Sequence, residues 1–288
     1  MFPDEKELEI YRSLPWHSRS LFYGWAGAGK TALAVSSFWD WEGGQQIANG
    51  RLLTFGGEYN EALGVPEELI RRFKSPSLTD NKWATELKRY TTALVKDAAA
   101  GKLELDAIVF DGFSEFDMLY EGVADAKGTD KFEKYDGLLM ELYANLSRLD
   151  PEVLGCDVLA TARVQEKRKA KASRTGRDIP GDPDYMTSDF YPAMRGSMRY
   201  SLPHYFNNVF FMEEQLVLMP GKAKRESAHA LTAIHTGGYL VKNQHKHLWV
   251  PAGLPPVVYN QTWPQLKLTL ARLRKGEAVE AEEVEEAE

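Results

Sequence analysis

The sequence predicts an α/β protein in which helices flank a mostly parallel central sheet with antiparallel strands at its edge. Apolar runs of strand length at residues 21–23, 51–55 and 107–111 alternate with segments of helical period in the first half of the chain. Strand-forming runs follow one another more closely after residue 208. Alternating strands and helices followed by neighbouring strands are typical of a parallel sheet with an antiparallel edge.

The helices of the first half are predicted mainly from apolar residues that recur with the period of a helix. They are expected over residues 31–39, 66–73, 83–100 and 136–149. Gly101 ends the third of these helices, and Pro151 closes the fourth. A further strand is expected over residues 157–161, so strands and helices alternate up to this point.

Residues 166–189 form a polar stretch that is rich in glycine and proline and has no periodicity. The stretch is too long for an ordinary connection, and loops of this length in compact domains are usually functional or disordered. We therefore expect a mobile basic loop over residues 166–190. The elements expected after it are a short helix over 195–202, a strand over 209–212, and a hairpin that pairs 230–234 with 239–241.

The composition is that of a globular protein without a membrane-spanning segment. The chain has 288 residues, of which 43% are hydrophobic, and no apolar run is long enough to cross a membrane. Its acidic start lacks the basic and apolar regions of a signal peptide, so we expect a cytoplasmic protein. The only cysteine, Cys156, excludes an internal disulfide and a cysteine-rich zinc site, and we expect it to be a buried structural thiol.

The net charge of −7 comes from the last twelve residues, which hold seven glutamates and no basic residue. The remaining 35 acidic residues equal the 35 basic ones in number, so the body of the chain is neutral. An acidic block of this kind repels itself and cannot bury apolar surface. We expect a lead-in over residues 1–19, one domain over 20–270, and a disordered acidic tail over 271–288. The tail either keeps the protein soluble, or docks on a partner or inhibits the protein by competing with nucleic acid.

Residues 24–31 carry the strongest functional signal, because their sequence GWAGAGKT fits the motif G-x-x-x-x-G-K-[ST] between a predicted strand and a predicted helix. Glycines let backbone N–H groups face phosphate oxygens, the lysine neutralises the β- and γ-phosphates, and the threonine hydroxyl ligates Mg²⁺. A glycine-rich turn that carries GKT by chance is the alternative. The residues expected to bind ATP are Gly24, Gly27, Ala28, Gly29, Lys30 and Thr31.

Two carboxylates are expected to complete this site. Asp111 ends a buried strand that we expect beside the strand before the loop, where a carboxylate can hold a Mg²⁺-bound water. Ser114 and Glu115 follow closely and can assist. Glu58 follows the second strand and can orient and deprotonate the attacking water, with Glu61 as its nearest competitor. The ordinary alternatives are a helix cap for Asp111 and a surface glutamate for Glu58.

Basic side chains gather in the long polar stretch, and aromatic rings follow them. Basic groups neutralise phosphates and aromatic rings stack on bases, so the region is typical of a surface that binds single-stranded DNA. A solvated lysine- and arginine-rich loop is the alternative. The residues concerned are Arg163, Lys167, Arg168, Lys169, Lys171, Arg174 and Arg177, then Tyr185, Phe190, Tyr191, Arg195, Arg199 and Tyr200.

Three residues near the predicted hairpin have ambiguous roles. Lys242 is either a surface lysine or a cation that reaches the γ-phosphate bound to a neighbouring subunit. His245 and His247 are two residues apart, but no carboxylate or cysteine stands out as a further ligand. We therefore expect them to be structural or surface histidines.

These motifs, in this order, resemble those of the RecA-like recombinase ATPases, and the likeness is greatest to the compact single-domain proteins encoded by bacteriophages. Residues 52–60 resemble the segment whose strand ends in the catalytic glutamate, and residues 108–111 resemble the Walker B strand. Arg163, with Gln165 close by, falls near the γ-phosphate sensor, which is a glutamine in RecA. Lys242 lies in a segment that resembles the one supplying a lysine across the subunit interface.

The resemblance implies a RecA-like P-loop ATPase that converts ATP and water to ADP and phosphate and anneals single-stranded DNA. It implies that Glu58, Lys30, Asp111 and Lys242 are catalytic, that Thr31 and Asp111 hold Mg²⁺, and that Arg163 contacts ATP. ATP would lie between the subunits of a ring or filament, and a single-strand binding protein would be a possible partner. The alternatives are a helicase loader or motor ATPase, and a nucleotide-dependent regulator that contacts no nucleic acid.

Overall fold

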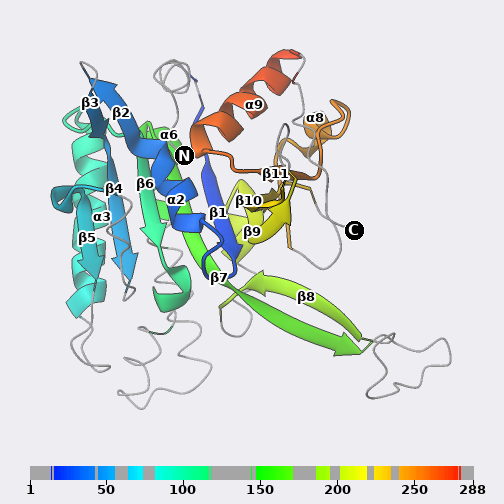
Figure 1. Cartoon of the computed structure of the whole chain (residues 1–288). Helices are drawn as coiled ribbons and strands as arrows, with labels where there is room; N and C mark the ends of the chain where they lie inside the picture. Colours follow the sequence, from blue (N-terminus) through cyan, green and yellow to red (C-terminus); the bar gives the residue numbers. More distant parts are fainter. Residues whose placement is uncertain are drawn as a thin grey trace.

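The computed structural model has an α/β fold, and its described residues form a nine-stranded, mostly parallel mixed sheet that is flanked by helices (Figure 1). The predicted fold class is confirmed at this level. The structure describes residues 14, 16–42, 45–55, 64–73, 82–116, 118, 144, 147–170, 186–194, 202–218, 224–234, 240–277 and 279.

Six neighbouring strands of the sheet are parallel, and antiparallel strands extend it on one side. The parallel strands, in spatial order, are β9 (Asn208–Val217), β1 (Arg19–Gly24), β7 (Asp157–Ala170), β6 (Ala107–Asp111), β4 (Gly50–Phe55) and β5 (Ile70–Phe73). The antiparallel strands are β10 (Glu226–Thr232), β11 (Val257–Tyr259) and β8 (Met186–Pro192), the last pairing with the outer part of β7. The expected antiparallel edge is therefore present.

The register places the ends of the parallel strands at one edge of the sheet. Gly24 at the end of β1 lies opposite Arg163 of β7, and Thr54 of β4 lies opposite Asp111 at the end of β6. Strand β7 lies between β1 and β6, so the expectation that the strand of Asp111 directly neighbours the strand before the glycine-rich segment is wrong. Side chains of β7 can therefore join the two predicted parts of the site.

Each face of the sheet is covered by its own layer of helices. The helix α3 (Lys82–Ala99) packs on one face, and α2 (Lys30–Val35) and α9 (Trp263–Lys275) pack on the other. Successive residues of a strand point to opposite faces, so Tyr23 faces the α3 layer and Phe22 the α2–α9 layer, both fully buried. A fully buried side chain of this kind stabilises the fold by about 1.5–3 kcal/mol relative to an exposed one.

Two of the predicted helices end or fold differently. The helix expected over 31–39 stops at Val35 and continues as a 3₁₀ turn (Ser36–Phe38), before β2 (Trp39–Glu42) pairs with β3 (Gln45–Ala48). The helix expected over 66–73 is wrong, because a 3₁₀ turn (Glu67–Leu69) leads into strand β5. In so short a segment the apolar spacing fits either period, and pairing with β4 decides for the strand.

The later part of the chain holds more strand than predicted. The strand expected over 157–161 is the start of the fourteen-residue β7, and β8 pairs with its outer half. The mobile loop expected over 166–190 is therefore wrong at both ends, and residues 171–185 lie outside the described part. The hairpin is also corrected: β10 pairs with β9 and β11, and Lys242 makes an isolated bridge to Val209.

Several expectations fall on residues outside the described ranges. They concern the helix expected over 136–149, the helix expected over 195–202 and the acidic tail, each of which lies mostly outside these ranges. Glu58 and Glu61 also lie outside them. The described part of the chain also includes the helices α6 (Pro151–Leu154) and α8 (Lys246–Trp249) and a 3₁₀ turn (Leu202–Tyr205). The expected domain boundary at residue 270 falls within α9.

One expectation from the composition agrees with the described part of the chain. Cys156 is fully buried, and burial raises the pKa of its thiol well above the ordinary value, so it is an unreactive structural residue. Within the described ranges, no helix combines the length and apolar character needed to cross a membrane.

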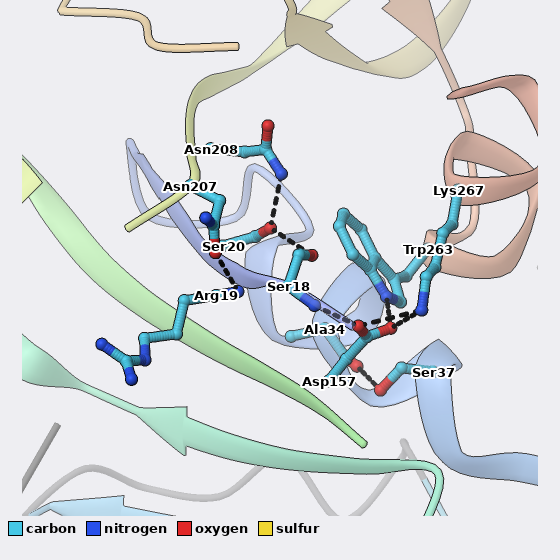
Figure 2. A network of polar contacts seen from close by, with 10 residues as sticks. All are labelled: Ser18, Arg19, Ser20, Ala34, Ser37, Asp157, Asn207, Asn208, Trp263 and Lys267. Carbon is cyan, nitrogen blue, oxygen red and sulfur yellow. Dashed lines mark hydrogen bonds and ion pairs between the residues drawn. The ribbon is translucent and has the colours of Figure 1, made fainter. Parts of the chain in front are cut away.

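A buried ion pair fixes α9 to the start of the sheet. Asp157, at the first position of β7, accepts hydrogen bonds from Lys267 Nζ at 2.9 and 3.0 Å and from Trp263 Nε1 at 2.7 Å (Figure 2). The backbone N–H of Ser18 donates a further bond of 2.8 Å to the same carboxylate. Both charged side chains are at most 1% exposed, so the carboxylate depends on these donors for its stability.

Candidate nucleotide-binding site

The glycine loop (residues 24–31) connects β1 to α2 at the carboxyl end of the parallel strands. Its glycines are required by geometry: a Cβ on Gly24 would lie 1.8 Å from the carbonyl oxygen of Met212, and Gly27 and Gly29 have φ angles of 81° and 77°. Gly29 is the N-cap of α2, and its carbonyl accepts from the N–H of Leu33 at 2.9 Å. The loop is thus a compact turn in which Trp25, Ala26 and Gly27 are exposed.

Lys30 folds back over the glycine loop. Its Nζ donates to the carbonyl oxygens of Trp25 at 2.6 Å and Gly24 at 3.2 Å. Burial lowers the pKa of Lys30, and Asp111 and Glu115 oppose this shift. The ammonium therefore lies within electrostatic reach of the carboxylates at this edge of the sheet, as expected for a charge that serves the same site.

Thr31 and Asp111 meet directly, although they are 80 residues apart in the sequence. The Thr31 hydroxyl donates to Asp111 Oδ1 at 2.7 Å, and the Thr161 hydroxyl of β7 donates to the same oxygen at 2.6 Å. The N–H of Gly112 donates to Thr161 Oγ1 at 3.0 Å, which fixes the hydroxyl between the two strands. Thr161 was not predicted as a site residue; the signal for it was a hydroxyl near the end of an apolar strand.

The donor set fits Mg²⁺ better than a transition metal. A hydroxyl and a carboxylate oxygen are the hard ligands that Mg²⁺ takes together with phosphate oxygens and water. Among the described residues, no three or more His, Cys, Asp and Glu side chains gather into a metal site. Thr31 and Asp111 would hold the ion, which when bound neutralises charge on the phosphates.

Arg163 is tied to the segment that follows Asp111. Its guanidinium forms an ion pair of 2.6 Å with Glu115 Oε1, and its backbone N–H donates to Ser114 Oγ at 3.0 Å. The Arg163 side chain is 65% exposed, while Glu115 is 13% exposed. Glu115 thus holds an accessible arginine beside the glycine loop. Both charges act on Lys30, since Glu115 raises its pKa and Arg163 lowers it.

An aromatic chain connects the glycine loop to the β7–β8 hairpin (Val164–Ala170 of β7 with β8). The Trp25 ring contacts Phe190 of β8 edge-on with centroids 6.1 Å apart, and Phe190 contacts Phe211 of β9 at the same separation. Tyr23 donates its hydroxyl to the carbonyl of Phe190 at 3.1 Å. Trp25 is 46% exposed, so it packs loosely between the loop and the base of the hairpin.

The β7–β8 hairpin projects from the body of the protein as a two-stranded arm (Figure 1). Three of the predicted DNA-binding residues, Lys167, Arg168 and Lys169, lie on the β7 strand of this arm, and Tyr191 of β8 is paired with Gln165. The other predicted DNA-binding residues lie outside the described part of the chain. They are Lys171, Arg174, Arg177, Arg195 and Arg199.

The structure does not bring Lys242 to the glycine loop of its own chain. Lys242 pairs with Val209 near the start of β9, and its Nζ donates to the carbonyl of Phe206 at 2.5 Å. Phe206 precedes β9, so the ammonium points toward the amino end of the parallel strands, whereas the loop lies at their carboxyl end. Its catalytic role across a subunit interface stays a prediction.

His245 is a buried core residue. Its ring contacts Trp16 edge-on with centroids 5.4 Å apart, and its Nε2 lies 3.0 Å from Gln244 Nε2. Burial, supported by the nearby positive charge of Arg274, lowers the pKa of His245 to about 4. The expectation of a structural histidine agrees with these contacts.

The lowered pKa of His245 predicts a loss of stability in acid. The unfolded chain binds a proton near pH 6.5, before the folded protein does, so the free energy of unfolding should fall as the pH drops from about 6.5 to about 4. In the variant His245→Gln the midpoint of thermal unfolding should change less over this interval. The exposed His204→Gln is the matched control and should behave as the wild type. A variant profile as steep as the wild-type one would contradict this assignment.

No protein-family model matches the chain, and a search of curated proteins gave no match. The geometry of the glycine loop and its neighbours is therefore what indicates a function for this chain. The structure brings the loop, Thr31, Asp111 and Arg163 to one edge of the sheet. It adds Thr161 and Glu115, which sequence reasoning had missed or left open.

Proposed function

We propose that the chain is a RecA-like P-loop ATPase that binds ATP with Mg²⁺ at the glycine loop and hydrolyses it. The observation that supports this most is the 2.7 Å hydrogen bond between Thr31 and Asp111. It joins the hydroxyl of the GKT sequence to a carboxylate at the end of another buried strand, as a shared Mg²⁺ site requires. The mostly parallel sheet with the loop at its carboxyl end is compatible with this fold family.

In this proposal the backbone of the glycine loop binds the phosphates, and Lys30 leaves its carbonyl partners to neutralise the β- and γ-phosphates. Glu58, which follows β4 in the sequence, takes the proton of the attacking water on its carboxylate. Arg163 exchanges Glu115 for the γ-phosphate and so reports whether ATP or ADP is bound. Lys242 acts on ATP held by the neighbouring subunit of an oligomer.

We further propose that the β7–β8 hairpin binds single-stranded DNA and that ATP controls its affinity, as in phage annealing proteins. The basic sequence on the arm supplies the cations, and Tyr191 supplies a ring for stacking. Trp25 contacts Phe190 of the arm, and Arg163, which is paired with Glu115, directly precedes the arm on β7. Binding of the γ-phosphate that disturbs either contact shifts the population of arm conformations and with it the DNA affinity.

A titration of fluorescent single-stranded DNA, with and without a non-hydrolysable ATP analogue and across a salt series, tests this proposal. We expect tighter binding with the analogue. The logarithm of the binding constant should fall linearly with the logarithm of the salt concentration, with a slope of about −0.7 for each neutralised phosphate. Replacing Lys167, Arg168 and Lys169 by glutamine should remove most of the salt-dependent binding. The matched control replaces Lys88, Lys96 and Lys102, three exposed lysines in and just after α3, with the same change of charge.

The outcomes of this titration separate the candidate functions. Absence of salt-dependent binding in both nucleotide states would overturn the DNA-binding proposal and favour a nucleotide-dependent regulator. Equal losses in the hairpin variant and the control would show that the arm is not the binding surface. Strand annealing by the DNA-bound protein supports the recombinase proposal, whereas unwinding without annealing supports a motor ATPase.

A further inference from the structure

A pocket of about 290 Å³ adjoins the glycine loop on the antiparallel side of the sheet. Its walls come from the outer face of α2, from β9 and β10, and from the turn between β11 and α9. Ala32, Leu33 and Leu231 supply apolar surface, while His229, Asn260 and Gln261 supply polar groups. Neither Thr31 nor Asp111 lines this pocket, although α2 carries Thr31, so the pocket lies beside the contact of these two residues.

Gly29 is the point at which the pocket meets the glycine loop, since it belongs to both. A Cβ at Gly29 would lie 2.9 Å from Cγ of His229, so the imidazole ring packs directly against this glycine. A ligand held by the loop through its phosphates therefore has the pocket as its immediate neighbour, with His229 at the boundary. Any side chain at position 29 would displace this ring.

The pocket suits an uncharged planar group. None of its lining residues carries a carboxylate, an ammonium or a guanidinium group. A further phosphate or a charged side chain would therefore find no counter-charge there, whereas a heteroaromatic ring finds apolar walls and a few polar groups for orientation. A nucleobase joined to its phosphates by a sugar has this combination of properties.

The polar side of the pocket is held by a reciprocal pair of hydrogen bonds. The N–H of His229 donates to Asn260 Oδ1 at 2.9 Å, and the N–H of Asn260 donates to the carbonyl of His229 at 2.9 Å. Asn260 has a φ of 48°, the one left-handed residue other than glycine in the described part of the chain. Both bonds hold the main chain of His229, and residues in sparsely populated backbone regions are common at binding sites.

We infer that this pocket receives the base and sugar of the bound nucleoside triphosphate, with His229 as a specificity-determining residue and Asn260 as a positioning residue. The inference rests on the proposed function, because only a ligand anchored at the glycine loop is delivered to the pocket. His229 contacts the nucleoside where it joins the phosphates, and the apolar faces of Ala32 and Leu231 enclose the base. Residues at the antiparallel side of the sheet thus determine which nucleoside triphosphate binds most tightly at the glycine loop.

Calorimetric titrations with ATP and with inorganic tripolyphosphate, each with Mg²⁺, test the inference because the two ligands share phosphates and differ in the nucleoside. We expect His229→Ala and the pocket-filling Ala32→Phe to weaken ATP binding about tenfold, the scale of one lost stacking contact with a base. Tripolyphosphate binding should change by less than about twofold, within the scatter of a distant substitution. His204→Ala and Ala99→Phe, at exposed positions elsewhere, are the matched controls.

Each result of these titrations bears on one proposal or on both. Equal weakening of ATP and tripolyphosphate, or unchanged ATP binding in both variants, would overturn the pocket assignment and leave the ATPase proposal standing. A wild-type protein that binds neither ligand would overturn both. A loss that is confined to ATP supports the pocket, and the preference among ATP, GTP, CTP and UTP should then become weaker in His229→Ala.

Discussion

Replacing Lys30 by methionine is expected to lower ATP turnover by about 10²- to 10³-fold, the usual cost of removing one group that stabilises charge in a transition state. Methionine keeps the apolar stem and removes only the ammonium group. That ammonium lies on the carbonyl oxygens of Gly24 and Trp25, beside the glycine loop. Steady-state phosphate release and equilibrium ATP binding measure the two parts of the effect.

The same variant should leave folding intact, which separates this effect from a loss of structure. Burial lowers the pKa of Lys30, which means that the fold disfavours the charged ammonium. Removing the ammonium should therefore not lower the midpoint of thermal unfolding. Lys246→Met, at an exposed position of α8, is the matched control for the loss of one lysine. Turnover at the wild-type rate in Lys30→Met would exclude the glycine loop as the hydrolysis site.

The parts of the site that could be predicted from the sequence are those whose chemistry is local. The glycine loop is a continuous motif, and Asp111 ends an apolar run whose strand character is evident. Thr161 could not be assigned in the same way, because its role depends on β7 lying between β1 and β6. Strand order is a property of the tertiary fold, and no short segment of sequence determines it.

His229 illustrates the same limit at the other side of the loop. It lies on β10, between β9 and β11, some two hundred residues after the glycine it touches, in a segment that is otherwise ordinary for an antiparallel strand. The predicted hairpin partner of β10 was wrong because a glycine-rich turn suggested a local pairing. Strand β10 pairs instead with the longer β9, and every residue of β10 from Glu226 to Thr232 has a partner there.

The β7–β8 hairpin was predicted as a loop because its composition is polar. A polar sequence without apolar alternation gives no hydrophobic period from which a strand could be predicted. The strand is instead fixed by pairing, since β7 enters the arm directly from the sheet core and β8 returns beside it. Continuity of β7 gives the proposed DNA-binding arm a stiff connection to Arg163 at the site.

The second large effect is expected at the opposite end of β7, where Lys267→Met should lower the free energy of unfolding by about 3–5 kcal/mol, the cost of breaking a buried ion pair. The carboxylate of Asp157 would remain buried with Ser18 and Trp263 as donors but without a counter-charge. Lys267 also lies over the Trp16 ring, 4.8 Å from its centroid, so an aromatic contact is lost as well. Urea unfolding curves measure the change.

A double-mutant cycle with Asp157→Asn separates the ion pair from the other contacts of each side chain. The double variant should be less destabilised than the sum of the single variants, because no unpaired charge remains in it. The exposed pair of Arg71 and Glu86 is the matched control, and Arg71→Met should cost less than about 1 kcal/mol because water screens it. Additive losses in the cycle would show that Asp157 and Lys267 do not stabilise each other.

The position of this pair predicts one further result for the same variants. Asp157 begins β7 and Arg163 lies opposite Gly24 at the other end of the sheet core, so the pair and the glycine loop occupy opposite edges. Under conditions in which Lys267→Met remains folded, its affinity for ATP should therefore equal that of the wild type. A weakened affinity in the folded variant would mean that α9 transmits its position to the loop, since α9 also borders the nucleoside pocket through the turn that precedes it.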